Sequence, residues 1–244
     1  METAKKRSFW NKFGLHKKGG ENDTACAEEA DVLLLPQNTD YLDMEKQYSQ
    51  IMFFYESGIR QLTAKLEILN HEFQNCYDRN PIENIKSRVK SPESILKKME
   101  KMGLPCTTRN MFNHIHDIAG VRVICPFISD VYDMSRMLLK QTDVELVQVK
   151  DYIKEPKENG YRSLHLLVLV DVFFSDQKRK VPVEIQLRTI AMNFWASLEH
   201  QLRYKKEREF TIDMQNELYE CSQLMSEADY RMQKLADSLR ERIT

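Results

Sequence analysis

Four short runs of β-branched and aliphatic residues in the middle of the chain constrain its fold more than any other feature. They span residues 120–124, 144–149, 164–170 and 181–187, and polar residues bound each of them. Runs of this length and composition are typical of β-strands. A helical pattern at residues 129–140 separates the first two runs, and a further helix is predicted after the last run, through Tyr204. The core is therefore predicted to be an α/β sheet flanked by helices.

Amphipathic patterns extend on both sides of this core. From residue 44 to residue 69 the apolar positions recur every three or four residues, which predicts a long scaffold helix. A Ser-Pro pair favours a helix start, so a helix is predicted from Pro92 to about Met102. A similar seam at residues 210–239 is predicted to pack either on the domain or on another subunit.

Length and composition favour one folded domain with an extension at each end. The 244 residues, of which 42% are hydrophobic, can bury one sizeable core. We predict a mobile extension at residues 1–38, the folded domain at 39–205 and a C-terminal helical segment, a possible oligomer contact, at 206–244. Basic and aromatic residues in the first extension, such as Lys5 and Trp10, could contact single-stranded RNA or a membrane surface, although such tails are also commonly only solvated.

Charge and cysteine content exclude several classes of protein. The 36 Lys and Arg residues nearly balance the 37 Asp and Glu residues, so any anion site must be local. The five cysteines are odd in number and form no C-x-x-C pair, which argues against a disulfide framework and a structural zinc site. No run approaches the roughly 18 apolar residues of a membrane span, and no secretory signal is visible. A cytoplasmic location is expected.

The first candidate functional cluster surrounds the predicted helix start at Pro92. Helix N-termini offer unpaired N–H groups, and cations neutralise a polyphosphate. The cluster is a candidate polyphosphate cradle, and the alternative is a solvated basic helix face, since no Walker-type glycine loop accompanies it. Its members are Arg88, Lys90, Ser91, Ser94, Lys97, Lys98 and Lys101.

The second cluster consists of two carboxylates, Asp117 and Glu184. Strand alternation places Glu184 on the polar side of an otherwise apolar strand. Mg²⁺ favours one or two protein carboxylates plus phosphate oxygens, and a carboxylate near a hydroxyl can accept its proton. The alternative is a salt bridge from Glu184 to Arg122 or Arg188.

The third cluster joins two predicted strands and combines cations with an aromatic ring. Tyr161 could stack on a base while Lys157 and His165 meet phosphates. The alternative is a plain hairpin connection with an Asn-Gly turn. The helix that follows Glu184 adds a polar stripe that either lines a pocket or is a half-exposed flank, formed by Asn193, Ser197, His200 and Tyr204.

Together, five ordered motifs resemble the RelA/SpoT synthetase family, and the continuation at residues 191–200 resembles its single-domain branch, the small alarmone synthetases. The resemblance covers about residues 42–240. The motifs are Arg88-Val89-Lys90-Ser91, Asp117-Ile118-Ala119-Gly120-Val121-Arg122, Lys150-Asp151-Tyr152-Ile153, Gly160-Tyr161-Arg162-Ser163-Leu164-His165 and Val183-Glu184-Ile185-Gln186-Leu187-Arg188-Thr189.

The resemblance implies an α/β (α+β) fold, a nucleotidyltransferase-like mixed sheet of about five strands flanked by helices, with long N- and C-terminal helices. It implies a GTP pyrophosphokinase that transfers the β,γ-pyrophosphate of ATP to the 3′-hydroxyl of GTP or GDP, makes pppGpp and ppGpp, releases AMP and carries no hydrolase domain. It also implies a homo-oligomer, a tetramer in one branch. Asn84 and Lys86 depart from the pattern of a product-activated branch. The rival hypotheses are a nucleotide- or RNA-binding regulator and a pyrophosphokinase with an adenine nucleotide as acceptor.

The resemblance also implies roles for individual residues. Asp117 and Glu184 would bind the cofactor Mg²⁺ and be catalytic, and Glu184 would help to deprotonate the acceptor hydroxyl. The implied ATP-binding residues are Arg88, Lys90, Ser94, Lys98 and Arg122. The implied GTP-binding residues are Lys150, Lys157, Tyr161, His165, Gln186 and Asn193.

Overall fold

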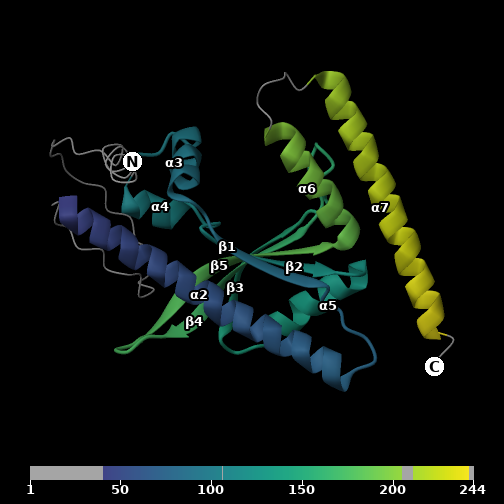
Figure 1. Ribbon diagram of the computed structural model, residues 1–244, viewed down its shortest axis with the longest axis horizontal. Coiled ribbons are helices and arrows are strands. Elements are labelled where there is room, and N and C mark those ends of the chain that lie inside the picture. Colours follow the sequence, from purple (N-terminus) through teal and green to yellow (C-terminus); the bar gives the residue numbers. More distant parts are fainter. Residues whose placement is uncertain (1–40, 106, 205–210, 242–244) are drawn as a thin grey trace.

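A five-stranded mixed sheet is the centre of the protein in this computed structural model, which describes residues 41–105, 107–204 and 211–241 (Figure 1). The predicted N-terminal extension, with Lys5 and Trp10, lies outside these residues, as does Phe210 of the predicted C-terminal seam. The strand order is β1-β2-β5-β4-β3, in which β2 and β5 are parallel and all other neighbours antiparallel. The strands are β1 (Asn84–Val89), β2 (Ala119–Cys125), β3 (Val144–Asp151), β4 (Leu164–Phe173) and β5 (Lys178–Thr189).

All four predicted strands are present, and the sheet of about five strands that the family resemblance implied is confirmed. The additional strand, β1, had no prediction from its residues. It lies at the sheet edge, where only Ile85 and Val89 of its six residues are partly buried. An edge strand needs few apolar side chains, so its sequence lacks the β-branched run that marked the others.

Five of the helices lie where the sequence placed them. Among these, α3 begins at Pro92 as predicted, after Ser91, whose side chain accepts a hydrogen bond from the Ser94 amide. The short α4 was not predicted, and its start is capped by Thr107, which accepts from the Asn110 amide at 3.1 Å. The helices are α2 (Tyr41–Cys76), α3 (Pro92–Lys101), α4 (Thr108–His114), α5 (Ile128–Leu139), α6 (Ile190–Tyr204) and α7 (Ile212–Glu241).

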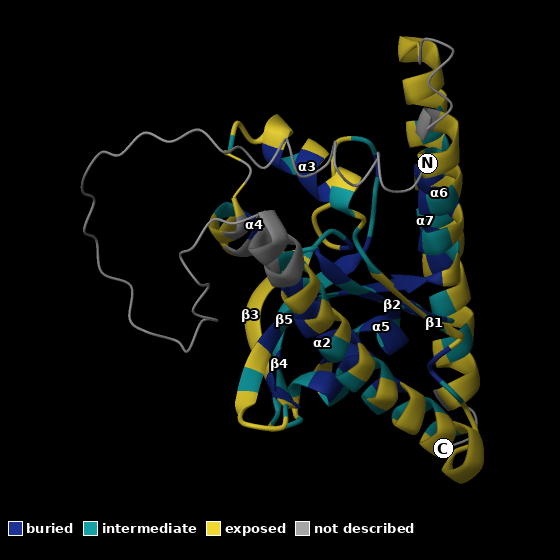
Figure 2. Cartoon of the chain, turned by 60° about the vertical axis from the view of Figure 1, so that its left-hand side comes forward, coloured by how far each residue is buried: buried dark blue, intermediate teal, exposed yellow. Residues whose placement is uncertain are grey.

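The hydrophobic core lies between one face of the sheet and the helices α2 and α5. Along β5 every second residue from Val181 to Leu187 is buried and belongs to the same cluster as buried residues of both helices. Gly58 permits the close approach of α2, because a Cβ atom there would lie 2.4 Å from Val181 Cγ1. Figure 2 shows buried residues along the sheet and exposed residues on the outer side of α2. The other face of the sheet is left to polar side chains.

Helix α7 lies beside α6 (Figure 1) and attaches to the domain largely through polar contacts. The hydroxyl of Thr189 donates to Asp229 at 2.5 Å, and the amide of Ser129 donates to Gln233 at 2.9 Å. The predicted apolar seam is only partly used, because Met232 and Leu235 are 54% and 60% exposed. None of the helices in the described ranges combines the length and hydrophobicity needed to cross a membrane.

Candidate functional site

A row of polar residues crosses the sheet, with one residue from every strand. Residues directly opposite one another on neighbouring strands project from the same face. This row therefore forms a polar floor on the face away from the α2 core, where alternation along β5 had predicted polar side chains. In order across the sheet it consists of Lys86, Arg122, Gln186, His165 and Lys150, each in register with the next.

Two cavities open over this floor and meet at the two predicted carboxylates. The larger has a volume of about 600 Å³, and the smaller about 220 Å³. Asp117, Glu184 and Gln186 line both cavities. Gly120 of β2 lies between Arg88 of β1 and Glu184 of β5. A Cβ atom on Gly120 would meet only the Arg88 carbonyl oxygen, at 3.9 Å. The absent side chain leaves room for the smaller cavity.

The two cavities differ in their linings. The smaller is bounded by the side chains of Lys86, Arg88 and Arg122. Burial lowers the pKa of Arg122, and the nearby charges of Arg188 and Arg88 lower it further. The larger cavity is lined by cations, aromatic rings and amides, among them Lys98, Lys150, Tyr152, Lys157, Asn159, Tyr161 and His165. Both cavities are therefore suited to anions, and the larger one also offers rings on which a planar group can stack.

Asp117 precedes β2 and is held by two lysines from the first predicted cluster. Its carboxylate lies 2.5 Å from Lys90 Nζ and 2.8 Å from Lys98 Nζ. Burial alone would raise the pKa of Asp117, but the hydrogen bonds and charges of the two lysines outweigh burial and lower it. Asp117 therefore stays ionised and connects the first predicted cluster to the floor of the site.

Glu184 contacts His165 rather than either arginine that the salt-bridge hypothesis named. The Nδ1 atom of His165 lies 2.8 Å from Glu184 Oε1, and the Gln186 amide donates to Oε2 at 3.2 Å. Burial would raise the pKa of Glu184, but the hydrogen bond and charge of His165 and the bond from Gln186 outweigh it, so the pKa is lowered. The salt-bridge alternative is wrong, because Arg122 bonds to Gln186 at 3.3 Å and Arg188 bonds elsewhere.

Tyr161 is fixed by its hydroxyl group. Arg188 Nη2 donates to that hydroxyl at 2.6 Å, and the hydroxyl lies 2.8 Å from His165 Nε2. The Lys157 ammonium lies 4.9 Å from the centre of the Tyr161 ring and 4.6 Å from that of Tyr152. A continuous chain of hydrogen bonds thus runs from Arg188 through Tyr161 and His165 to Glu184.

The loop that carries Tyr161 requires glycine at its turn. Gly160 has φ of 85°, a conformation that favours glycine, and a Cβ atom there would lie 2.0 Å from the Ser222 hydroxyl of α7. On the other side of Tyr161, Arg162 donates to the Ser222 carbonyl oxygen at 3.5 Å and to Gln223 at 3.3 Å. Helix α7 therefore supports both neighbours of Tyr161, and the loop is more than a plain hairpin.

The structure brings most of the predicted site residues together. Of the predicted ATP-binding set, Arg88 and Arg122 line the smaller cavity, and Lys98 lines the larger one. Ser94 is exposed, with its hydroxyl 3.0 Å from that of Ser91. Of the predicted GTP-binding set, Asn193 lies outside the linings of both cavities in the described part of the chain, and its buried Oδ1 has no hydrogen-bond partner there. The remaining five members of that set line the larger cavity.

Several lining residues had no prediction. Glu199 of α6 borders the larger cavity, whereas the neighbouring His200 of the predicted polar stripe is exposed. Lys86 lies in register with the predicted Arg122, and Gln148 lies two positions before the predicted Lys150 on β3, so strand pairing and alternation could have identified both as lining residues. Arg188 was considered only as a partner for Glu184, because nothing local marks its bond to Tyr161.

The two carboxylates suit a magnesium ion that is also held by phosphate oxygens. Mg²⁺ usually takes one or two protein carboxylates and completes its shell with water and phosphate. Asp117 and Glu184 supply two carboxylates at the junction of both cavities, and their charges interact. Within the described ranges no group of three or more His, Cys, Asp or Glu residues could hold a metal ion. The donor set thus fits Mg²⁺ that arrives with a nucleotide.

Comparisons with known proteins identify the family of this chain. Residues 87–209 match the family model described as a region found in RelA / SpoT proteins. The GTP pyrophosphokinase YwaC of Bacillus subtilis (strain 168) is 45% identical over 181 residues, which cover 74% of this chain and 86% of YwaC. The GTP pyrophosphokinase YjbM of the same organism is 34% identical over 197 residues, which cover 81% of this chain and 92% of YjbM.

Solved structures with the same fold include two small alarmone synthetases of Bacillus subtilis. Synthetase 1, bound to its product pppGpp, superimposes with a TM-score of 0.73 and 35% identity, covering 79% of this chain and 98% of that chain. Synthetase 2 superimposes with a TM-score of 0.71 and 41% identity, covering 78% of this chain and 98% of that chain. The similarity thus extends over more than three quarters of this chain.

Proposed function

Because this chain belongs to the RelA/SpoT family, we propose that it is a GTP pyrophosphokinase of the alarmone-synthesising kind. It transfers the β,γ-pyrophosphate of ATP to the 3′-hydroxyl of GTP or GDP and releases AMP. The observation that carries this proposal is that Asp117 and Glu184 line both cavities. A group-transfer enzyme must hold two substrates end to end with its catalytic groups between them.

The smaller cavity is proposed to receive ATP. Arg88 and Arg122 lie on adjacent strands, where their planar guanidinium groups can stack on adenine or pair with phosphate. Lys90 and Lys98 are then placed at the triphosphate, since both contact Asp117 at the junction. Ser94 lies in the first turn of α3, where its hydroxyl can donate to a phosphate oxygen.

The larger cavity is proposed to receive GTP or GDP. Its volume of about 600 Å³ is in the range of cavities that bind small ligands. The Tyr161 ring offers a surface on which guanine stacks, and Lys150 and Lys157 offer charges for the 5′-phosphates. Gln186, on the floor, can bond the ribose or a phosphate. The side-chain oxygen of Asn193 is buried and has no hydrogen-bond partner among the described residues. The Asn193 side chain must therefore rotate out of this position to contact the base.

Glu184 is proposed to accept the proton of the acceptor hydroxyl. Its lowered pKa keeps the carboxylate ionised, and His165 holds it in position. The ribose 3′-oxygen attacks the β-phosphorus of ATP, the bond from that phosphorus to the AMP oxygen breaks, and the 3′-proton passes to Glu184. Mg²⁺ held by Asp117 and Glu184 would neutralise charge on the transferred group. Lys90 and Lys98 contribute further positive charge and orient the donor.

A homo-oligomer, a tetramer by analogy with one branch of the family, is proposed to form through α7. The helix attaches to its own domain by polar bonds and leaves Met232, Leu235 and Leu239 more than half exposed. These residues follow a heptad spacing, which is typical of helix-to-helix contacts between copies. We also propose a cytoplasmic location, because the proposed substrates, ATP and GTP or GDP, are cytoplasmic nucleotides.

The rival hypotheses make different predictions for one experiment. Purified protein would be incubated with Mg²⁺, GTP and ATP labelled in the β-phosphate, with Glu184→Gln and the exposed Glu67→Gln in parallel. We expect label on guanosine pentaphosphate and release of AMP, with a loss of at least about 10²-fold in Glu184→Gln only. A binding regulator would release no AMP, and an adenine-specific enzyme would label an adenine nucleotide in preference to GTP.

A further inference from the structure

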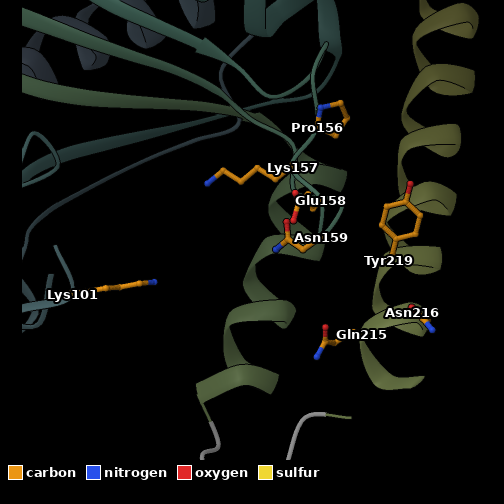
Figure 3. Close-up of a pocket in the computed structure, with 8 residues that line it drawn as sticks. All are labelled: Lys101, Pro156, Lys157, Glu158, Asn159, Gln215, Asn216 and Tyr219. Carbon is orange, nitrogen blue, oxygen red and sulfur yellow. The ribbon is translucent and has the colours of Figure 1, made fainter. Parts of the chain in front are cut away.

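A third cavity, with a volume of about 1,090 Å³, lies between the end of α3, the loop at residues 156–159 and the start of α7 (Figure 3). Lys101 of α3 lies on one side of it, and Gln215, Asn216 and Tyr219 of α7 lie on the other. The side chains of Lys101 and Lys157 extend toward the space between them in Figure 3. The cavity therefore places two ammonium groups opposite amide side chains.

The three cavities follow one another in a defined order. Glu184 lines both the 220 Å³ and the 600 Å³ cavities, whereas Lys157 and Asn159 line both the 600 Å³ and the 1,090 Å³ cavities. The acceptor cavity is thus the middle one. Glu184 marks its border with the donor cavity, and Lys157 marks its border with the third.

This order sets the direction of the acceptor nucleotide. In the proposed function the 3′-hydroxyl of the acceptor lies at Glu184. The 5′-phosphates leave the ribose on the side away from the 3′-oxygen, so they extend from Glu184 toward Lys157. A phosphate chain that continues past Lys157 enters the third cavity, where the next cation is Lys101.

We propose that the third cavity receives the terminal 5′-phosphate of the acceptor, and that Lys101 thereby determines the preference for GTP over GDP. This inference rests on the proposed function. Burial and the charges of Lys150 and Arg188 lower the pKa of Lys157, and the charges of Glu184 and Glu199 oppose this shift. A phosphate beside Lys157 would therefore offset the repulsion among these three cations. The diphosphate of GDP ends near Lys157, whereas the additional phosphate of GTP reaches the ammonium of Lys101.

The test compares Lys101→Met with Lys140→Met, which removes an exposed lysine at the C-terminal end of α5 that lies outside all three linings among the described residues. Calorimetry gives the dissociation constants for GTP and GDP, and turnover gives kcat/KM for each acceptor and KM for ATP. In Lys101→Met we expect GTP binding and kcat/KM to weaken about tenfold, as when a hydrogen bond to a charged group is lost. GDP and ATP should change by less than about twofold, and Lys101→Arg should restore the preference.

Several results would overturn the inference. These are an equal loss for GTP and GDP, a higher KM for ATP, an unchanged GTP affinity, or the same selective loss in Lys140→Met. The binding measurement separates the two proposals. If the wild-type protein transfers no label but Lys101→Met still loses GTP affinity selectively, the proposed reaction fails while the phosphate site stands.

Discussion

His165 connects Glu184 to Tyr161, with Nδ1 at 2.8 Å from the carboxylate and Nε2 at 2.8 Å from the phenol hydroxyl. One imidazole ring thus joins the proposed proton acceptor to the proposed base-stacking ring. The sequence had suggested that His165 contacts phosphate, and that contact stays a prediction; in this structure its ring nitrogens face Glu184 and Tyr161. Its position indicates that it orients Glu184 and maintains its charge.

Replacing His165 by Asn should shift the acidic limb of the pH profile. Asparagine can donate a hydrogen bond but carries no charge, so the pKa of Glu184 should rise when His165 is removed. The carboxylate is then protonated at a higher pH, and activity should be lost at a higher pH as the solution is acidified. The measurement is kcat/KM for GTP against pH, with His71→Asn on α2 as control. If the acidic limbs of the wild-type and His165→Asn profiles coincide, His165 does not influence the ionisation of Glu184.

Replacing Asp117 by Asn should increase the Mg²⁺ requirement. The change removes one proposed ligand charge and leaves Lys90 and Lys98 without their carboxylate partner. The Mg²⁺ concentration for half-maximal rate should rise at least about tenfold. The measurement is a Mg²⁺ titration of turnover, with the exposed Asp176→Asn as control. An unchanged titration would remove Asp117 from the proposed metal site.

Two substitutions at Tyr161 should separate its ring from its hydroxyl. Tyr161→Ala removes the stacking surface and should raise KM for GTP, since a base–aromatic stack contributes roughly 1–3 kcal/mol. Tyr161→Phe keeps the ring but removes the bonds to Arg188 and His165, so KM should change little while kcat falls. Steady-state kinetics with GTP varied at saturating ATP gives both constants. Equal increases of KM in both variants would contradict stacking as the role of the ring.

Replacing Gly160 by Ala should destabilise the protein. The new methyl group would clash with Ser222, and the positive φ adds about 1–2 kcal/mol for a residue with a Cβ atom. In a Ser222→Gly background the clash is removed and only the backbone cost remains. Urea unfolding of the four proteins forms a double-mutant cycle, whose coupling energy measures the contact. Additive changes in the free energy of unfolding would show that α7 moves away from the loop at no cost, so that Gly160→Ala causes no clash with Ser222.

Charges on the exposed seam of α7 should dissociate the proposed oligomer. Leu235→Glu combined with Leu239→Glu places carboxylates on side chains that are 60% and 62% exposed, so the fold of the subunit should persist. Light scattering after size exclusion should report a smaller species, with an unchanged circular dichroism spectrum. Ser238→Glu, exposed on the same helix, is the control. A mass equal to that of the wild-type protein would place the subunit contact elsewhere.

Local sequence determined the elements and much of their polarity. Period-two alternation on β5 identified Glu184 and Gln186 as polar-face residues, and a Ser-Pro pair marked the start of α3. Such patterns can be recognised from the sequence because they depend only on residues close to one another along the chain. The edge strand β1 and the short α4 were missed because neither buries a regular apolar face.

Only the tertiary structure decided how these residues meet. Strands β2 and β5 pair in parallel although 52 residues separate Cys125 from Lys178, and this pairing places Arg122 beside Gln186. The bond of His165 to Glu184 and the support of Gly160 by Ser222 likewise join distant segments. Their register depends on how the whole core packs rather than on local periodicity. The sequence therefore determined which side chains could carry the chemistry, and packing decided their partners, their ionisation and the order of the three cavities.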